Sequence, residues 1–472
     1  MTRPISLSNL RLSASVVAAK VTAAGIRALG RGGGTSGPGL VAERIDPGML
    51  TKLTSRLEHG AIVVAGTNGK TTTSRMVADI LVANGHRVVH NRSGSNLVRG
   101  VVSAFAAQAS PAGNPGGDVA VIETDEAAFP DIVRLVRPRM ILLTNLFRDQ
   151  LDRYGELDTI ARKWKASLAT LDTETTIVFN ADDPGLTSIT RDLRARPVAF
   201  GLNERKHTLD SLPHAADAAI CFACGADLAY SWLYLSHLGD WYCPSCGESR
   251  PHLDVAGGEV ELDGVESLAM TIDRGGESDR YSIGVPGLYN AYNMLAAVAA
   301  TRHADVAQST VHTALAMFRS AFGRIERISF RDRQLTLALV KNPVGFNEVL
   351  RMLTAETGTL SVPTLIAIND LYADGRDVSW LWDVDFELLA DGESMIGATG
   401  LRGADMANRL KYAGVSGARI RALPADLEVG LDRFVEQIPA GEQGYILPTY
   451  TAMLEIRKIL ADRGAVETFW KQ

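Results

Sequence analysis

The residues with the most recognisable chemistry form the segment GTNGKTTT at 66–73. Glycines at 66 and 69 would let the backbone approach an anion closely, and the free N–H groups of a following helix would bind phosphate. Lys70 is placed to reach the β- and γ-phosphates of a nucleotide, and the Thr71 hydroxyl to ligate Mg²⁺. Val64 stands where the standard motif has its first glycine. The segment therefore predicts a variant nucleotide-binding loop made of Gly66, Thr67, Asn68, Gly69, Lys70, Thr71 and Thr72.

The four cysteines of the chain form a second group with clear chemistry: Cys221, Cys224, Cys243 and Cys246. Two C-x-x-C pairs can close a tetrahedral thiolate site around Zn²⁺ that leaves no position for water. We expect a structural zinc ribbon rather than disulfides, which a cytoplasmic chain would keep reduced. If all four thiols bind metal, none is free as a nucleophile, so this chain cannot by itself be a cysteine-dependent glutaminase.

An acid-rich segment near the C-terminus is the third group. Its five aspartates are Asp370, Asp374, Asp377, Asp383 and Asp385. A turn such as ADGRD needs one or two acids for its geometry. The others are either solvated loop acids or include a carboxylate that orients or charges a group on a partner.

The elements that must position these groups are typical of an α/β protein. Short apolar runs alternate with segments of helical period, and strands that are apolar throughout indicate a parallel sheet covered on both faces. The runs of the first series are 61–66, 87–91, 119–124, 140–145 and 176–183, and those of the second are 335–340, 364–370, 394–400 and 419–424. Helices are expected in the second half of 281–301 and within 445–461.

Composition allows two or three packed domains, since the chain has 472 residues of which 46% are hydrophobic. We expect a basic N-terminal helix with a Gly-rich linker at 1–42. A nucleotide-binding domain follows at 43–324, with the zinc ribbon inserted at about 203–254. A C-terminal α/β domain occupies 325–472.

The first 42 residues contain five basic residues and no acid. We expect this amphipathic helix to pack on the main domain, and contact with anionic lipid is the alternative. No signal peptide and no apolar run long enough to span a bilayer is visible, so we expect a cytoplasmic protein, with the inner face of the plasma membrane as the surface that it could reach. The net charge of −6 argues against a nucleic-acid-binding protein.

The variant loop Gly-Thr-x-Gly-Lys-Thr-Thr resembles that of the Mur ligase superfamily, the ATP-dependent amide-forming enzymes of peptidoglycan and polyglutamylfolate synthesis. Further matches follow in the expected order: IETDE from 122, TNLFRDQLDRYGE from 144, NADDP from 180, GLYNAYNMLAA from 287 and FGRIE from 322. The resemblance implies an α/β fold in which a Mur ligase central P-loop domain carries the inserted four-cysteine zinc ribbon and is followed by a Rossmann-like C-terminal α/β domain.

The site residues follow from the same matches. Glu123 ends an apolar strand, where ligands bind in such sheets, and together with Thr71 it could hold Mg²⁺. By resemblance Lys70 and Glu123 are catalytic, and Asn145, Asp149 and Asp152 line the reaction centre. The remaining nucleotide contacts implied are Asn180, Asp183, Asn290, Asn293 and Arg324.

The chain departs from the Mur ligases that add amino acids. Gln150 stands where they have histidine, and LALVKNP has no acid where they place a ribose-binding aspartate. Lys163 and Lys165 are the nearby candidates for their carbamylated lysine. The chain also lacks the N-terminal domain that binds their UDP-linked substrate, so the expected substrate is not a UDP-sugar.

Within the superfamily, the zinc ribbon, KNPVGFNE from 341 and NDLYADGRDVSW from 369 resemble the ligase subunits of the lipid II isoglutaminyl synthases. This resemblance implies a heterodimer with a GatD-type class I glutamine amidotransferase, to whose Cys–His pair Asp377 would add the third member of a triad. The implied reaction is ATP-dependent amidation of the D-glutamate α-carboxylate of the lipid II stem peptide to D-isoglutamine, through an acyl phosphate. The alternatives are a ligase that adds an amino acid directly, like the folylpolyglutamate synthases, and a nucleic-acid-binding ATPase that uses the ribbon to grip strands.

Overall fold

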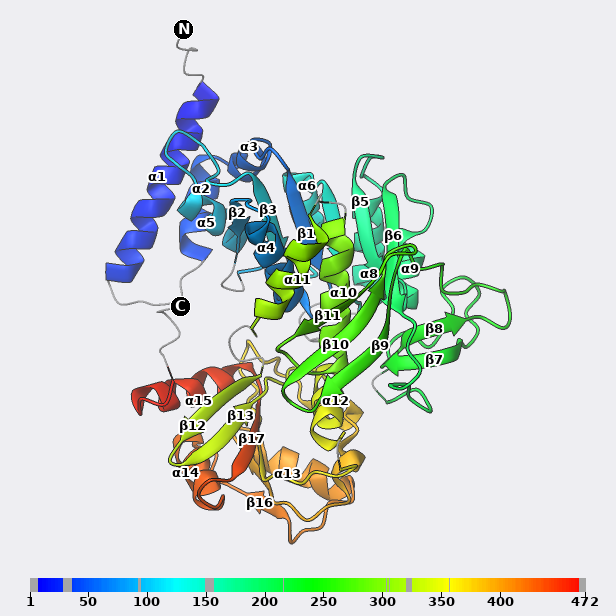
Figure 1. Ribbon diagram of the computed structural model, residues 1–472. Helices are drawn as coiled ribbons and strands as arrows, with labels where there is room; N and C mark the ends of the chain where they lie inside the picture. Colours follow the sequence, from blue (N-terminus) through cyan, green and yellow to red (C-terminus); the bar gives the residue numbers. More distant parts are fainter. Residues whose placement is uncertain are drawn as a thin grey trace.

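The computed structural model describes residues 7–28, 36–91, 95–148, 157–214, 216–302, 304, 306–319, 325–355 and 357–466. These residues form two α/β lobes, seen one above the other in Figure 1. The first lobe is built on a nine-stranded sheet and the second on a six-stranded sheet. Among the described helices, none combines the length and the hydropathy that a membrane span requires.

The first sheet has the strand order β11-β10-β9-β6-β5-β4-β1-β3-β2. Its strands are β1 (Ala61–Ala65), β2 (Val88–His90), β3 (Val119–Glu123), β4 (Met140–Leu143), β5 (Thr176–Asn180), β6 (Arg196–Leu202), β9 (Val255–Asp263), β10 (Ser267–Asp273) and β11 (Ser278–Ile283). The strands from β2 to β9 in this order are parallel, and β10 and β11 are antiparallel. The parallel sheet predicted from the apolar runs is therefore confirmed for β1 to β5.

The antiparallel strands at this sheet's edge were not predicted. Along β10 the residues alternate between buried and half-buried. A strand with one face covered alternates in this way, whereas the predicted strands are runs that are apolar throughout.

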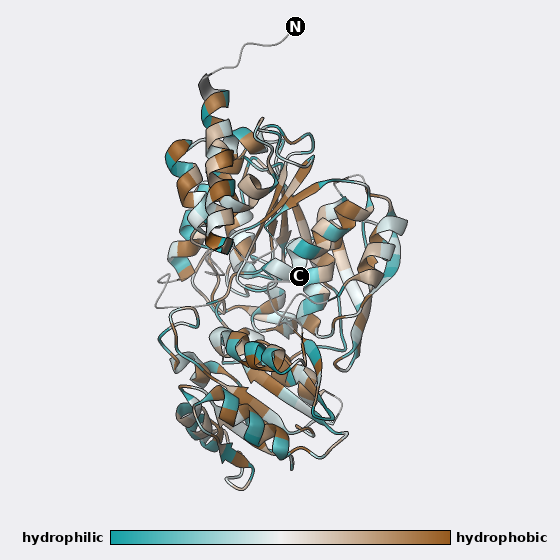
Figure 2. Ribbon diagram, turned by 90° about the vertical axis from the view of Figure 1, so that its left-hand side faces the viewer, coloured by the Kyte–Doolittle hydropathy of each residue, from teal (hydrophilic) through white to brown (hydrophobic). Residues whose placement is uncertain are grey.

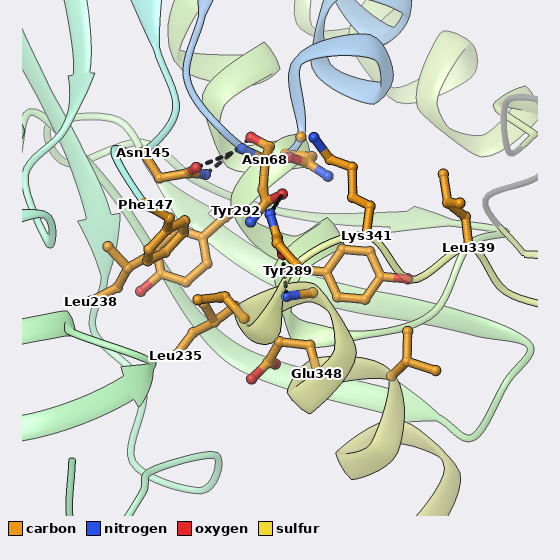
Figure 3. Close-up of a pocket in the computed structure, with 16 residues that line it drawn as sticks. Asn68, Asn145, Phe147, Leu235, Leu238, Tyr289, Tyr292, Leu339, Lys341 and Glu348 are labelled. Atoms are coloured by element: carbon orange, nitrogen blue, oxygen red, sulfur yellow. Dashed lines mark hydrogen bonds between the residues drawn. The ribbon is translucent and has the colours of Figure 1, made fainter. Parts of the chain in front are cut away.

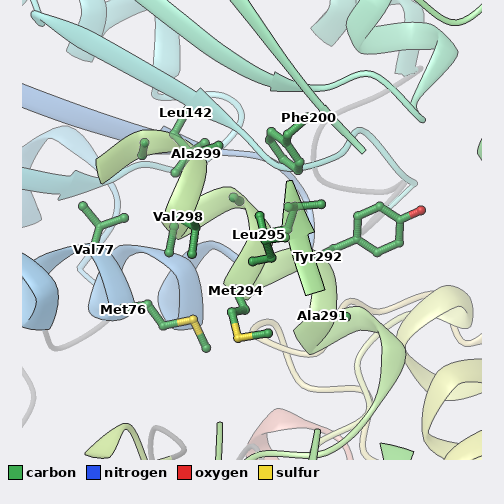
Figure 4. Packing of buried hydrophobic residues seen from close by; sticks show 14 of the residues in the cluster. Met76, Val77, Leu142, Phe200, Ala291, Tyr292, Met294, Leu295, Val298 and Ala299 are labelled. Atoms are coloured by element: carbon green, nitrogen blue, oxygen red, sulfur yellow. The ribbon is translucent and has the colours of Figure 1, made fainter. Parts of the chain in front are cut away.

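Helices cover both faces of the first sheet. On one face lie α4 (Lys70–Ala83), α10 (Leu288–Arg302) and α11 (Gln308–Met317). Figure 4 shows α4 and α10 packing there, with Met76 and Val77 near Met294 and Val298. On the other face lie α3 (Met49–Thr54), α5 (Val98–Gln108), α6 (Phe129–Val136), α8 (Leu157–Leu168) and α9 (Pro184–Thr190).

The N-terminal segment forms two helices, α1 (Leu7–Ala28) and α2 (Ser36–Ile45). Leu12, Val16 and Ala19 of α1 are buried in the core on the α5 side of the sheet. The end of the predicted linker is thus helical. A Cβ atom at Gly39 would lie 2.0 Å from the carbonyl oxygen of Arg99, so this glycine serves the close packing of α2 on α5 rather than flexibility.

The second sheet has the order β12-β13-β17-β14-β15-β16, with β12 antiparallel to β13 and the other pairs parallel. Its strands are β12 (Glu326–Phe330), β13 (Arg333–Leu337), β14 (Thr364–Ala367), β15 (Ile396–Thr399), β16 (Ile420–Ala422) and β17 (Gln443–Pro448). One face is covered by α12 (Pro343–Thr354), η1 (Ser379–Asp383), η2 (Phe386–Leu389) and α13 (Gly403–Tyr412), and the other by α14 (Leu427–Glu436) and α15 (Tyr450–Asp462). Figure 2 shows hydrophobic strands behind helices of mixed hydropathy in this lobe.

A separate hairpin of β7 (Ala229–Leu235) and β8 (Leu238–Tyr242) lies between β6 and β9 in sequence. The cysteine pairs flank it. The predicted domain boundary at 324/325 adjoins residues 320–324, which lie outside the described residues, and the domain limits stay predictions.

Candidate functional site

The predicted phosphate-binding loop joins the carboxyl end of β1 to the first turn of α4. Gly66 has a φ of 142° and Gly69 a φ of 84°, values that residues with a side chain rarely adopt. A Cβ atom at Gly66 would lie 2.0 Å from Thr144 Oγ1, and one at Gly69 would lie 2.0 Å from Asn293 Oδ1. Both positions therefore require glycine. The loop is held between the segment after β4 and helix α10.

Lys70 is the first residue of α4 and is 7% exposed. Its Nζ donates to the backbone oxygens of Gly66 at 2.5 Å and Thr67 at 3.0 Å, and it forms an ion pair with Glu126 Oε1 at 3.0 Å. The ammonium group thus stays beside the loop. Sequence reasoning missed Glu126, although it ends the matched segment IETDE, because spacing alone does not show which acid faces the lysine.

Thr71 and Glu123 are brought together as predicted from their elements. Glu123 is the last residue of β3, next to β1 in the sheet, and it is buried. Thr71 Oγ1 donates to Glu123 Oε1 at 3.0 Å. A hydroxyl and a carboxylate oxygen in contact are the hard ligands that Mg²⁺ prefers, so this pair could hold the ion beside a bound nucleotide.

Asn68 connects the loop to two other segments. Its N–H donates to Asn145 Oδ1 at 2.8 Å, and Asn145 Nδ2 donates to the Asn68 backbone oxygen at 3.0 Å, as the dashed lines in Figure 3 show. From the second lobe, Asn342 Nδ2 donates to Asn68 Oδ1 at 3.0 Å. Asn342 lies in the matched segment KNPVGFNE but was not predicted as a site residue, because its role depends on how the lobes dock.

The two asparagines of α10 form a chain of hydrogen bonds that ends at α4. Asn290 Nδ2 donates to the backbone oxygen of Pro286 at 2.6 Å, and Asn293 Nδ2 donates to Asn290 Oδ1 at 2.9 Å. Thr73 Oγ1 donates to Asn293 Oδ1 at 3.2 Å. Asn293 therefore faces the phosphate-binding loop, and Asn290 orients it.

Asn180 is the last residue of β5, Asp183 follows this strand, and both are completely buried. Asn180 Nδ2 donates to the Thr144 backbone oxygen at 3.1 Å. Asp183 caps α9 and accepts a hydrogen bond from the N–H of Leu146 at 2.8 Å. In this structure both residues form hydrogen bonds with backbone groups of the segment after β4. Their predicted contact with a nucleotide stays a prediction. Thr72 is likewise buried inside α4.

Several predicted residues cannot be placed in this site. Arg324, Asp149, Asp152 and Gln150 lie outside the described residues. Lys163 and Lys165 lie on α8 with exposed side chains, and Lys165 Nζ is 3.4 Å from the backbone oxygen of Ser188.

A pocket opens beside the loop, between the two lobes (Figure 3). The loop side contributes Asn68, Gly69, Asn145 and Asn293, and the apolar walls include Phe147, Leu235, Leu238, Tyr289, Tyr292 and Val344. The second lobe adds Lys341 and Glu348, and burial raises the pKa of the Glu348 carboxyl. Apolar walls with a few polar groups next to a phosphate-binding turn suit a nucleotide, with its base in the pocket and its phosphates on the loop.

The four cysteine sulfur atoms lie within 4.8 Å of one another. The Sγ atoms of Cys221 and Cys246 are 3.6 Å apart, and those of Cys224 and Cys243 are 3.5 Å apart. A tetrahedral zinc site with Zn–S bonds of about 2.3 Å has sulfur–sulfur edges of about 3.8 Å. The donor set and its spacing therefore fit a thiolate metal site.

Four of the five aspartates in the acid-rich segment have partners within the fold. Asp370 pairs with Arg402 at 3.2 Å, Asp383 with Arg148 at 3.7 Å, and Asp385 with His214 at 3.1 Å. Asp374 is buried and accepts a hydrogen bond from the Thr451 N–H at 2.7 Å.

Asp377 differs from these four because it is exposed. Its Oδ1 accepts a hydrogen bond from the Ser379 N–H at 2.8 Å, and this bond with that of the Ser379 side chain lowers the carboxyl pKa. Asp377 lines a surface hollow together with Trp382 and Arg402. It is thus an ionised acid that another molecule can reach.

Large apolar side chains are exposed on the same lobe. Tyr372 is 77% exposed, Tyr412 72% and Trp382 52%. The rings of Trp382 and Tyr412 meet edge to face with centroids 5.5 Å apart. Exposed aromatic groups of this size beside a polar hollow are typical of a protein-binding surface.

Comparisons with known protein families match both lobes. The family model described as the Mur ligase middle domain matches residues 64–219, and the one described as MurT ligase C-terminal matches residues 339–453. Among solved structures, a pseudomurein peptide ligase type C from Methanothermus fervidus superposes with a TM-score of 0.66 at 19% identity, covering 85% of this chain and 78% of that one. MurF from Acinetobacter baumannii gives 0.65 at 16% identity, covering 89% and 80%. These similarities confirm the Mur ligase α/β fold.

Curated relatives match over most of the chain. The subunit MurT of lipid II isoglutaminyl synthase (glutamine-hydrolyzing) from Streptococcus pneumoniae is 34% identical over 461 residues, 97% of this chain and 99% of the relative. The subunit of the same name from Staphylococcus aureus strain COL is 32% identical, covering 84% of this chain and 87% of the relative. The UDP-N-acetylmuramate–L-alanine ligase of Lachnospira eligens is 25% identical over 57% of this chain and 46% of the relative.

Proposed function

This chain belongs to the MurT family of Mur-type ligases, and we propose that it is the ligase subunit of a lipid II isoglutaminyl synthase in peptidoglycan biosynthesis. The observation that carries this proposal is the 34% identity to a subunit of that name over almost the whole length of both chains. The reaction is ATP-dependent amidation of the D-glutamate α-carboxylate of the lipid II stem peptide, which gives D-isoglutamine.

The phosphate-binding loop suits the first step, because a carboxylate does not react usefully with ammonia until it is activated. The γ-phosphoryl group of ATP is transferred to a carboxylate oxygen, ADP leaves, and the product is an acyl phosphate. Such a transfer needs positioning and charge neutralisation more than covalent help. Lys70 and the N–H groups at the start of α4 supply both. Mg²⁺ bound by Thr71 and Glu123 would neutralise further phosphate charge.

In the second step ammonia attacks the acyl carbon, inorganic phosphate leaves, and the nitrogen loses a proton to form the amide. Water would compete with ammonia for the acyl phosphate. The position of the pocket between the lobes, where Asn342 of the second lobe binds Asn68 of the loop, supports a site that closes around this intermediate.

We expect the four cysteines to hold structural Zn²⁺ as a zinc ribbon, because a site with four thiolates has no open position for substrate. With every thiol bound to the metal, this chain offers no thiol nucleophile for releasing ammonia from glutamine. The ammonia must then come from another subunit.

That subunit is a GatD-type class I glutamine amidotransferase, and Asp377 completes its catalytic triad. Asp377 would fix the tautomer of the partner's histidine and stabilise its imidazolium form. The exposure of Asp377, its lowered pKa and the exposed Trp382 ring in the same hollow support this role.

The test is to express the chain with and without a glutaminase subunit and to follow lipid II by mass spectrometry. With both subunits, glutamine and ATP, we expect the mass change of a carboxylic acid converted to a carboxamide. Amide formation by the chain alone with a free amino acid would instead favour the amino-acid-adding alternative. Amidation at full rate without ATP would contradict the proposal.

We further propose that the outer face of α1 contacts an anionic membrane surface, where a lipid-linked substrate lies. Its exposed apolar residues follow a spacing of four and three, which places them in one stripe: Leu10, Ala14, Val17, Val21 and Ala24. In Figure 2, α1 stands at the front of the molecule. The charged residues of α1 are all basic, which favours anionic lipid and opposes pairing of the stripe with a second copy.

Flotation with vesicles that contain or lack phosphatidylglycerol tests this contact. Val17→Asp should weaken binding to the anionic vesicles by about tenfold, because it removes apolar contact and adds a negative charge. Val429→Asp is the matched control, since Val17 is 44% and Val429 43% exposed. Equal binding of both variants would contradict the proposal, as would dimerisation through α1 in sedimentation velocity.

A further inference from the structure

The tip of the β7–β8 hairpin is buried, whereas hairpin tips usually lie at the surface where water solvates their backbone. All residues from 233 to 239 are buried, and Trp232 nearer the base is exposed. The turn residue Ser236 has a φ of 51°, an uncommon value for a residue with a side chain. Burying such a turn requires hydrogen-bond partners for its polar groups.

The partners come from the segments that follow β4 and β5. The N–H of Gly239 donates to the Asp182 backbone oxygen at 3.0 Å, and Trp241 Nε1 donates to that of Ala181 at 3.0 Å. The His237 ring packs against the Phe147 ring with centroids 4.8 Å apart. The tip is therefore fixed to the carboxyl edge of the first sheet, where the candidate site lies.

Two leucines of the tip face the pocket. Leu235 and Leu238 line it together with Gly69 of the phosphate-binding loop and with Val344 of the second lobe. Figure 3 shows both leucines on the side of the pocket opposite Lys341. Residues from the cysteine-bearing segment thus form part of the wall beside the loop.

Two of the cysteines belong to the small core at the base of the hairpin. Strand β8 begins at Leu238 and ends one residue before Cys243. The core at the base of the hairpin consists of Cys221, Leu228, Trp241 and Cys243, with Ala226 and Tyr230 against it. A core this small contributes little stability by itself, and the cysteines form no disulfide, so metal bound by the four thiols would stabilise the base of the hairpin.

We propose that the hairpin tip is a wall of the nucleotide pocket, and that metal bound at the cysteine cluster sets nucleotide affinity by holding Leu235 and Leu238 in place. The inference rests on the ATP-binding part of the proposed function. It gives the cysteine-bearing insertion a part in substrate binding in addition to its part in folding.

The experiment measures binding of a fluorescent ATP analogue with Mg²⁺ to the full chain in complex with its partner. Leu238→Ala should raise Kd by about tenfold, because shortening this side chain removes apolar contact with the nucleoside. Leu212→Ala is the matched control, because Leu212 belongs to the same insertion but is exposed. It should leave Kd unchanged.

Two further measurements distinguish a leucine that contacts the nucleotide from one that only stabilises the fold. Adding the nucleotide should slow hydrogen exchange at residues 235–239 as well as at 66–71. Removing zinc with a chelator, checked by metal analysis, should raise Kd in the wild-type complex while the exchange of strands β1 to β5 stays slow.

The inference is overturned if Leu238→Ala lowers the melting temperature with no change in Kd, or if nucleotide protects the loop but not the tip. Either result leaves the proposed amidation reaction intact. Conversely, normal nucleotide binding with no lipid II amidation would contradict the proposed function and not this inference.

Discussion

At the scale of single residues, the ion pair between Lys70 and Glu126 affects how the lysine can bind a nucleotide phosphate. The ammonium group is paired with a buried acid, and phosphate oxygens must compete with that acid and with two loop carbonyls for its hydrogen bonds. Lys70 is therefore held ready at the loop, with its charge balanced until a phosphate arrives.

Replacing Lys70 by alanine should lower the rate of amidation by about 10²–10³-fold or more, because a charge that stabilises the transferring phosphoryl group is lost. The measurement is product formation by the complex, with glutamine and with ammonium as nitrogen source. Lys52→Ala is the control, since Lys52 pairs with Asp46 elsewhere in the first lobe and should retain full activity. Normal amidation by Lys70→Ala would remove the loop from the mechanism.

Asp377→Asn should impair the release of ammonia from glutamine and leave the amidation step itself intact. In the proposed triad the partner's histidine would lose its orienting acid, so we expect glutamine-driven amidation to fall by about 10²–10⁴-fold. Amidation driven by free ammonium should continue at the wild-type rate. If the ammonium-driven reaction is lost to the same extent, Asp377 acts in the ligase site instead.

At the scale of elements, the turn from β1 into α4 requires glycine at positions 66 and 69, where an added Cβ would contact neighbouring side chains too closely. Gly69→Ala should prevent nucleotide binding, because its Cβ would overlap Asn293 Oδ1. Gly441→Ala is a matched control with nearly the same φ, 85° against 84°, and nothing within 4 Å of the added Cβ. We expect both variants to lose about 1–2 kcal/mol of stability from the left-handed backbone. Equal nucleotide affinity of the two variants in titration calorimetry would show that the close contact does not matter.

The sequence predicted those parts of the site that depend on local pattern. The loop, Thr71 and Glu123 could be placed because a parallel strand and a following helix bring such residues to one edge of the sheet. Glu126, Asn342 and the hairpin tip could not, because each acts through a contact between segments far apart in the chain. Asn180 and Asp183 bind backbone groups through their side chains in the structure, and the nucleotide contact that the family match implied stays a prediction.

At the scale of the whole molecule, Asn342 joins the lobes at the loop. It caps α12 by accepting from the Gly345 N–H at 2.8 Å, and it donates to Asn68. These two side-chain hydrogen bonds serve different tasks, one the stability of α12 and the other the docking of the lobes.

Asn342→Ser separates these tasks, because serine also caps helices but is too short to reach Asn68. We expect a melting temperature close to that of the wild type, with a raised KM for ATP for both nitrogen sources. Asp426→Ser, at the cap of α14, is the control and should leave KM unchanged. An unchanged KM in Asn342→Ser would mean that the lobes dock without this bond.

The position of the cysteine-bearing insertion in the chain bears on how the protein is made. Strands β9, β10 and β11 follow the insertion in sequence and complete the sheet beyond β6. A newly synthesised chain that cannot fold its insertion is expected to leave the β6 edge unpaired and open to proteases and aggregation. Cells starved of zinc should therefore accumulate less of this protein, and wall synthesis would become sensitive to metal supply through protein abundance.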